Sequence, residues 1–384
     1  MPVYSTPVYL DNISTTRIDP AVYQTMIPYF DEIYGNASSI HKPGTKSSLG
    51  IEKSRLIIAS KINALPEEIY FTSGGTESNN WALKGAFYAS KFEKIHIIVS
   101  SIEHPSIYET ATWLENHNAE ITYLPVDNKG LVNIDDLRKT IRKNTILVSI
   151  IHASNEVGTI EPIEEIGNIC KEKNIYFHTD ACQSFTKVQI DVEKQGIDMA
   201  TFNAHKCHGP KGIGALFIRK GTLIDPFLHG GSQERGMRSG TYATSLIAGF
   251  GKAVEIANEN DILQMKNLRD YFIDLILRTV GNAHLNGCEG DDRICNNINI
   301  GFGGISGKQL FSELNKKNVF ISAGSACSST KLTPSMVLKS MSQSDEVADS
   351  AVRIGLSKWT TSEELDLAAY HIKEIVKDLR KKNG

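Results

Sequence analysis

Short buried strands alternate with amphipathic helices over most of the chain, and this alternation limits the fold more than any other feature. Several strand candidates, such as ILVSIIHAS, are nearly continuous apolar runs, as expected when helices cover both faces of a sheet. The segments that indicate strands are 68–73, 96–101, 121–126, 146–154, 175–181, 199–205 and 214–220. Helix candidates between them include 133–143 and 163–173. The pattern predicts an α/β domain with a mostly parallel sheet.

The pattern changes after about residue 245. The segments that follow are a long helical stretch (246–280), a strand (296–302), a helix (306–318), the Gly/Ser-rich SAGSACSST (322–330), a strand (351–359) and a terminal helix from 361. They predict a second, smaller α+β domain packed on the first, with a site between the two. We assign residues 15–255 to the large domain, and residues 1–14 and 256–384 to the small one.

Composition excludes several classes of protein. The formal net charge of −3 provides no basic field, so nucleic acid is not expected as a main partner and any RNA contact would need a local patch. No apolar run approaches the roughly 18 residues of a membrane helix, and MPVYSTPVYLDN does not resemble a secretory signal. The six cysteines form no C-x-x-C pair, which favours reduced thiols and a cytoplasmic location.

The stretch TSGGTESNN (72–80) leaves a strand and enters a helix. Gly74 and Gly75 permit close backbone approach, Thr76 adds a hydroxyl, and the free N–H groups of a helix start favour a bound anion. The functional interpretation is a phosphate cradle. The simpler one is a glycine turn with an N-cap, and the stretch alone favours it, because the spacing matches neither the Walker motif nor G-x-G-x-x-G.

The stretch HTDACQS (178–184) places Asp180 and Gln183 at the carboxyl end of a strand, where open α/β sheets bind ligands. An aspartate there could hold a cationic ring nitrogen, and a glutamine could donate to a phenolic oxygen. For a single aspartate taken alone, a helix N-cap is the commoner role.

In FNAHKCHGPKGIGALF (202–217), Lys206 follows a strand and precedes a glycine-proline break, which would hold it at the edge of the sheet. Taken alone, a lysine is most often solvated. A metal site formed by His205, Cys207 and His208 is disfavoured, because neighbouring side chains on an extended segment point to opposite faces. Taken together, a phosphate cradle, an acid for a ring nitrogen and a lysine for a Schiff base are what pyridoxal 5′-phosphate requires.

A longer series of motifs gives a family resemblance. The motifs are YLDNISTT, YGNASSIH, TSGGTESNN, EHPSI, ASNEVGTIEPI, HTDACQ, NAHKCHGPKGIG, GMRSGT, SAGSACSS and TPSMVLKSM. In this order, from about residue 8 to 361, they resemble the class I cysteine desulfurases of the class-V aminotransferase family, which serve iron–sulfur cluster assembly and nitrogen fixation. The resemblance implies the aspartate-aminotransferase fold (fold type I) and a homodimer with pyridoxal phosphate near the subunit interface.

The resemblance also implies roles in cofactor binding. Lys206 would bond covalently to the cofactor, Asp180 would pair with the pyridinium nitrogen, and His104 would stack on the ring and assist acid–base steps. The remaining implied cofactor contacts are Gln183 to the ring oxygen, Gly75, Thr76, Asn203 and His205 to the phosphate, and Thr241 of the other subunit, also to the phosphate.

The implied reaction converts L-cysteine to L-alanine. Asn155 and Arg353 would bind the substrate carboxylate, and Cys327 would accept the sulfur as a persulfide for an iron–sulfur scaffold or another acceptor. No resident metal is expected, although the Cys327 persulfide could transiently ligate a nascent cluster. The alternatives are a selenocysteine lyase, an aminotransferase without use for the GSAC thiol, and a non-catalytic scaffold or sulfur-relay protein that would not need Lys206 or Asp180.

The sequence departs from the family pattern at three positions. Asn203 replaces a common serine, and its amide can still donate to phosphate. Gly75 stands where alanine is frequent, a mild change by sequence. Lys358 replaces the second arginine of the Arg-x-Ser-Leu-Gly-Arg pattern, so support for Arg353 from that position is in doubt.

Overall fold

The computed structural model describes residues 7–323 and 335–383. Its largest sheet has seven strands in the order β2-β8-β7-β6-β5-β3-β4. The strands are β2 (Ile69–Thr72), β3 (Ile95–Ser100), β4 (Ala119–Leu124), β5 (Thr145–Ser149), β6 (Tyr176–Asp180), β7 (Met199–Asn203) and β8 (Gly214–Ile218). All pairings are parallel except those of β8, which runs antiparallel to β2 and β7. The mostly parallel sheet predicted from the sequence is confirmed.

Helices cover both faces of this sheet, because successive strand residues point to opposite faces. In β3, Ile97 and Val99 pack in one apolar cluster with α4 and α5, whereas Ile98 packs in another with α3, α7 and α8. The helices are α1 (Pro20–Met26), α2 (Pro28–Asp31), α3 (Lys42–Lys61), α4 (Gly75–Ala89), α5 (Pro105–Glu115), α6 (Ile134–Thr140), α7 (Ile163–Lys173) and α8 (Thr244–Glu255). This double cover explains why the strands are continuous apolar runs.

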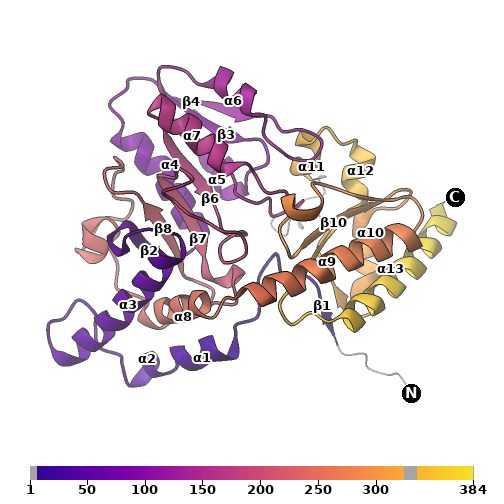
Figure 1. Ribbon diagram of the computed structural model, residues 1–384, viewed down its shortest axis with the longest axis horizontal. Helices are drawn as coiled ribbons and strands as arrows, with labels where there is room; N and C mark the ends of the chain where they lie inside the picture. Colours follow the sequence, from indigo (N-terminus) through magenta and orange to yellow (C-terminus); the bar gives the residue numbers. More distant parts are fainter. Residues whose placement is uncertain (1–6, 324–334, 384) are drawn as a thin grey trace.

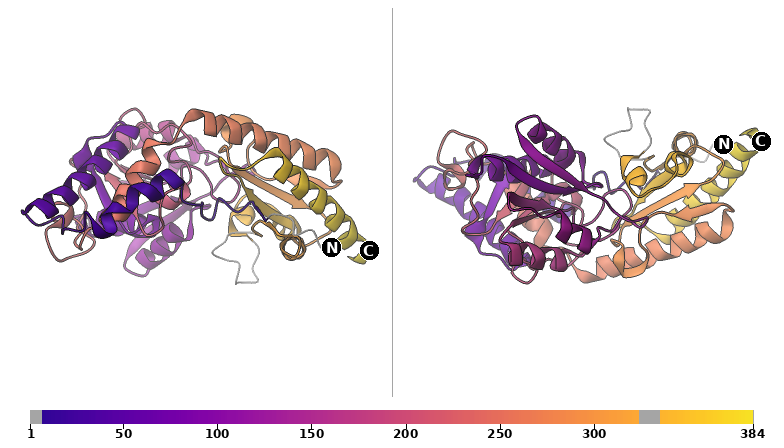
Figure 2. Two further views of the ribbon diagram at one scale, coloured as in Figure 1. Left: turned by 90° about the horizontal axis from the view of Figure 1, so that it is seen from below. Right: turned by 90° about the horizontal axis from the view of Figure 1, so that it is seen from above.

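A second unit is built on a three-stranded antiparallel sheet in the order β12-β10-β9. Its elements are α9 (Glu259–Thr279), β9 (Ala283–Leu285), β10 (Asn297–Phe302), α10 (Gly307–Asn315), α11 (Met336–Ser340), α12 (Asp345–Ser350), β12 (Ala351–Gly355) and α13 (Ser362–Asn383). The first strand of the chain, β1 (Val8–Tyr9), pairs here in parallel with β11 (Val319–Phe320). Figures 1 and 2 show the two units side by side along the long axis.

Each unit has its own apolar core. Val8 and Leu10 pack with residues of α9, β10 and α13, whereas Val337 and Leu338 of α11 pack with the core of the large sheet. We propose the domain bounds given above, 15–255 against 1–14 and 256–384. Ala348 of α12 and Ala351 of β12 also pack with the large core, so α11, α12 and β12 of the small domain all contact it. No helix in the described ranges is both long enough and apolar enough to span a bilayer.

Several predictions of secondary structure are wrong in their extent. The strands predicted for 146–154 and 351–359 end at Ser149 and Gly355. The stretch 246–280 is two helices, because the Asn258 side chain accepts a hydrogen bond from the Asp261 N–H and starts α9 after a break. The strand predicted for 199–205 ends at Asn203, and Ala204–Lys206 form a 3₁₀ turn. Lys206 therefore lies in a tight turn beyond the strand rather than on an extended segment.

Candidate functional site

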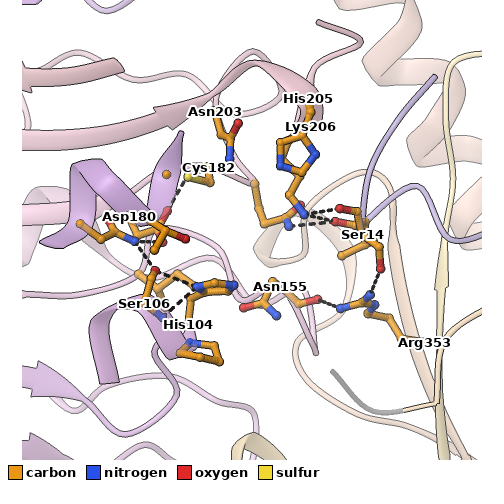
Figure 3. A pocket seen from close by; sticks show the side chains of 17 residues that line it. Ser14, His104, Ser106, Asn155, Asp180, Cys182, Asn203, His205, Lys206 and Arg353 are labelled. Carbon is orange, nitrogen blue, oxygen red and sulfur yellow. Dashed lines mark hydrogen bonds between the residues drawn. The ribbon is translucent and has the colours of Figure 1, made fainter. Parts of the chain in front are cut away.

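A cavity of about 250 Å³ lies where the carboxyl ends of β6 and β7 face the first turns of α4 and α5 (Figure 3). The predicted site residues that line it are Gly75, Thr76, His104, Asn155, Asp180, Gln183, Asn203, His205, Lys206 and Arg353. Arg353 comes from β12 of the small sheet, so both units contribute to the cavity. The structure thus brings together residues that are up to 278 positions apart, from Gly75 to Arg353 (353 − 75).

The start of α4 has the features of an anion cradle. Its N-cap, Gly74, has a φ of 153° and no side chain that could cap the helix, so the first N–H groups lack an intrahelical acceptor. The Asn203 amide lies close by, since a Cβ on Gly75 would be 3.3 Å from its Nδ2. The Asn203 Nδ2 is a donor, as the free N–H groups of the helix start are, so both can donate hydrogen bonds to one anion. This pattern fits a site that a phosphate completes.

Of the other two residues predicted to contact the phosphate, His205 lines the cavity and Thr241 does not. The His205 Nδ1 pairs with the Thr15 hydroxyl at 3.1 Å, and burial, together with Lys206, lowers the pKa of His205 to about 3. Thr241 is exposed and does not line this cavity. It follows Arg238, whose guanidinium forms two hydrogen bonds with Glu77 of α4, at 2.7 and 3.0 Å. The role of Thr241 toward another subunit stays a prediction.

A chain of hydrogen bonds orients the acid at the end of β6. Asp180 is 4% exposed, and its Oδ2 accepts a hydrogen bond from Asn79 at 2.7 Å. The same Asn79 amide donates to the Ser106 hydroxyl at 2.8 Å. The Ser106 N–H donates to His104 Nδ1 at 3.1 Å, so in neutral His104 the proton is on Nε2. Burial lowers the pKa of His104, which favours that neutral form.

Asn79 and Ser106 were not assigned from the sequence. Both lie inside motifs that drew attention for other residues, TSGGTESNN and EHPSI. Both are buried polar side chains near the starts of helices. The contacts of Asn79 to Asp180 and Ser106 depend on how α4 lies against β6 and α5, whereas the contact of Ser106 to His104 is a local one at the start of α5. The signal in the sequence was a polar residue near the start of each helix, at a position that the fold buries.

The Lys206 amine is held inside the cavity. Its Nζ donates to the carbonyl oxygens of Ile13 and Ser14 at 2.6 and 2.8 Å. Burial, followed by the charge of Arg353, lowers the pKa of Lys206 to about 8. A considerable fraction of the amine is therefore neutral near pH 8, as a nucleophile or a base requires.

The side chains of His205, Cys207 and His208 each have a separate hydrogen-bond partner and do not converge on one point. The Cys207 thiol donates to the Ala204 carbonyl at 3.2 Å, and His208 Nδ1 contacts the Arg17 carbonyl at 3.1 Å. His205 is paired with Thr15. The extended geometry assumed for these residues is wrong, because the backbone turns here. Within the described ranges no three His, Cys, Asp or Glu side chains gather as metal ligands would.

Arg353 lies at the small-domain side of the cavity and is 2% exposed. One terminal nitrogen donates to the Asn155 backbone carbonyl at 3.0 Å, which leaves the Asn155 side-chain amide available to a ligand. Lys358 does not support Arg353. It pairs instead with Asp19 at 2.6 Å and lies 3.9 Å from Asp261 of α9. The change from arginine to lysine thus affects a contact between α1 and α9 rather than the cavity.

The described cysteines differ in their access to the cavity. Of Cys170, Cys182, Cys207, Cys288 and Cys295, Cys182 alone lines it. Burial, followed by Asp180, raises the pKa of the Cys182 thiol well above its usual value, which keeps it protonated and a poor nucleophile. Cys327, the predicted sulfur acceptor, lies outside the described residues.

Cys182 leaves room for a glycine, but not for a larger residue, at position 75. A Cβ added to Gly75 would lie 2.7 Å from Cys182 Sγ, closer than real atoms approach. The glycine at this position is therefore not the mild change that the sequence indicated. Gly75→Ala is expected to lower the free energy of unfolding by about 1–3 kcal/mol.

The double variant Gly75→Ala/Cys182→Ala is expected to recover most of that loss, because it removes the clashing sulfur atom. Urea unfolding of the wild type, both single variants and the double variant measures the coupling between the two positions. If Gly75→Ala lowers the free energy of unfolding equally in the presence and absence of the Cys182 sulfur, the two residues do not contact each other as inferred.

The class-V aminotransferase family model matches residues 8–367. The chain belongs to this family. Among relatives of this class-V aminotransferase, cysteine desulfurase IscS of Dictyoglomus turgidum is 46% identical over 376 residues, which cover 97% of this chain and 95% of the relative. Cysteine desulfurase IscS of Methanosarcina thermophila is 46% identical over 376 residues, with 97% and 93% covered.

A solved NifS-like protein matches this class-V aminotransferase with a TM-score of 0.90 and 38% identity, over 97% of this chain and 99% of that one. A solved structure of SspA in complex with cysteine matches with a TM-score of 0.83 and 38% identity, over 93% and 100%. The predicted fold and the predicted kinship with the cysteine desulfurases are confirmed.

Proposed function

We propose that this class-V aminotransferase is a pyridoxal-phosphate-dependent cysteine desulfurase, which converts L-cysteine to L-alanine and transfers the sulfur to its own Cys327. The observation that carries the proposal is the meeting, in one cavity, of a buried amine of lowered pKa, an oriented carboxylate and an uncapped helix start. The relatives named cysteine desulfurase and the neighbour solved with cysteine support it.

The residues present fit pyridoxal phosphate. The phosphate would occupy the cradle formed by the start of α4, Thr76 and the Asn203 Nδ2, all of which can donate hydrogen bonds to it. Asp180 would hold the ring nitrogen, and Lys206 would form the covalent bond; both line the cavity. When bound, the cofactor supplies an aldehyde that condenses with amines and a ring that withdraws electrons from the substrate.

The side chains of the chain have separate tasks. Asp180, oriented by Asn79, would pair with the ring nitrogen. The Lys206 amine would be the base for the substrate Cα proton, since its lowered pKa provides the neutral form. His104 would cover the ring face, and Arg353 with Asn155 would bind the substrate carboxylate.

Sulfur transfer needs a thiolate. The Cys327 thiolate attacks the sulfur of L-cysteine, so a sulfur–sulfur bond forms while the carbon–sulfur bond breaks. The bonding electron pair stays with the carbon, which takes up a proton and leaves as L-alanine. The persulfide left on Cys327 passes its outer sulfur to an acceptor, and we propose an iron–sulfur scaffold protein in keeping with the IscS relatives.

We also propose a homodimer. Apolar side chains that lie exposed on the N-terminal helices and the segments beside them are Phe30, Tyr34, Ile40, Leu49 and Leu56. A second copy would cover this surface and bring its Thr241 to the phosphate cradle. We place the protein in the cytoplasm, where its thiols stay reduced.

The test of the function is a product assay. The full-length protein, supplied with pyridoxal phosphate, L-cysteine and a thiol reductant, is expected to release L-alanine and sulfide in equal amounts. Amino-acid analysis and a sulfide assay measure the two products. Formation of a keto acid instead of alanine would indicate transamination, turnover of L-selenocysteine alone would indicate a selenocysteine lyase, and no turnover would indicate a scaffold.

A further inference from the structure

The segment between β1 and α1 contacts both cations that face the cavity. The Lys206 amine donates to the carbonyls of Ile13 and Ser14, as described above. The Arg353 guanidinium donates to the Ser14 hydroxyl at 2.6 Å, in a contact visible in Figure 3. One short stretch of chain thus places the amine and the guanidinium relative to each other.

Asp11 lies behind this contact and gathers three donors on one oxygen. Its Oδ1 accepts hydrogen bonds from the hydroxyls of Ser14 and Ser322, each at 2.8 Å, and from the Arg353 guanidinium at 3.3 Å. Ser14 therefore accepts from Arg353 and donates to Asp11. The hydroxyl and the carboxylate together fix one edge of the guanidinium.

Arg353 keeps unused donor capacity on another edge. Its Nε is buried and has no hydrogen-bond partner in the described part of the chain. Glu156 is a second carboxyl group near Arg353, but burial raises the pKa of Glu156, which favours its neutral form. The carboxylate that forms an ion pair with Arg353 is that of Asp11.

An incoming substrate carboxylate therefore meets a guanidinium whose charge is already partly compensated. Because the Arg353 guanidinium is buried, charges beside it are screened less than in water, and the repulsion between the two carboxylates offsets part of the attraction to Arg353. We propose that Asp11 is a specificity-determining counter-ion that sets the affinity of the site for the substrate carboxylate, and that the Ser14 hydroxyl positions the Arg353 guanidinium. This inference rests on the proposed function, because it takes Arg353 as the residue that binds the carboxylate.

Asp11→Asn and Ser14→Ala separate the two roles. The asparagine retains an oxygen for Ser14 and Ser322 but removes the charge, whereas the alanine retains the charge but removes the hydroxyl. The probe is 3-mercaptopropionate, which is L-cysteine without its amino group and so cannot condense with the cofactor. Isothermal titration calorimetry on the full-length protein, with and without pyridoxal phosphate, measures its Kd.

Opposite effects are expected. Asp11→Asn should lower the Kd about three- to tenfold, because one repelling charge is removed, and Ser14→Ala should raise the Kd by about the same factor, because the guanidinium loses its short hydrogen bond. Asp19→Asn is the matched control. It removes a carboxylate that pairs with Lys358 rather than with Arg353, and it should leave the Kd unchanged.

Two results would overturn the inference in different ways. If the wild type binds the probe and Asp11→Asn binds it equally or more weakly, Asp11 supports the fold and does not compete with the ligand. If the wild type binds no 3-mercaptopropionate in either form, the assignment of Arg353 to the substrate carboxylate fails, and the counter-ion role fails with it.

Discussion

Lys206→Ala is expected to abolish the visible absorption of the cofactor-loaded protein at about 400 nm. It should also lower the rate of L-cysteine turnover by a factor on the order of a thousand or more. The Lys206 amine is the lysine that lines the cavity within the described chain. Lys187 lies close by, but its ammonium donates to the carbonyls of Gln183 and Lys206. It is thus held outside the cavity and is not placed to substitute.

Lys211→Ala is the matched control, since this exposed lysine follows only five residues later (211 − 206) beyond the Gly-Pro turn. It should leave absorption and turnover unchanged. In the wild type, the rate at which cofactor-free protein takes up pyridoxal phosphate should increase as the pH rises through about 8, because only the neutral Lys206 amine is nucleophilic. A normal visible band in Lys206→Ala would rule out this residue as the point of attachment.

Cys327→Ala is expected to keep the cofactor spectrum and still bind L-cysteine, yet to release almost no sulfide in the presence of a reductant. In the proposed function, Lys206 and Asp180 hold the cofactor and Arg353 binds the substrate carboxylate, and the contacts described for these three side chains do not involve Cys327. Without the Cys327 thiolate, no nucleophile is present to accept the substrate sulfur, so the carbon–sulfur bond is not broken. Sulfide release by Cys288→Ala, which alters a cysteine outside the cavity, should stay normal.

Mass spectrometry of the wild type after a single turnover identifies the acceptor directly. One added sulfur, about 32 Da, is expected on the peptide that contains Cys327. Cys182 is the competing thiol, because it lines the cavity, but its raised pKa keeps it protonated. Sulfur on the Cys182 peptide, or full desulfuration by Cys327→Ala, would assign the nucleophile elsewhere.

The sheet and much of the cavity were predictable because their signals are local. Each strand of the large sheet is a short apolar run, and Asp180 and Asn203 lie at the strand ends, where an α/β sheet gathers its ligands. The helix α3 gave no such signal. Its buried face mixes Ile51, Ile58 and Ala59 with Ser47, Ser54 and Arg55, so the apolar periodicity is interrupted.

The contacts that complete the site could not be predicted, because they join distant parts of the chain. The pairing of Asp11 with Arg353 spans 342 residues, and the hydrogen bond from Asn79 to Asp180 spans 101. The motif YLDNISTT drew attention to this stretch of the sequence, but not to Asp11 or Ser14 as partners of Arg353. Likewise, the break before α9 depends on one polar cap, Asn258, which an apolar periodicity does not detect.

The pairing of β1 with β11 has a consequence for the order in which the protein can be assembled during synthesis. The ribosome releases Val8 early, but the strand that receives it, and the Gly355 carbonyl that accepts the Asn12 amide from 343 positions away, are made last. The loop that holds Lys206 is therefore anchored at one end only until nearly the whole chain has emerged. Nascent chains that stop before β12 would contain Lys206 but lack Arg353, so the cavity is complete only after nearly the whole chain has been made.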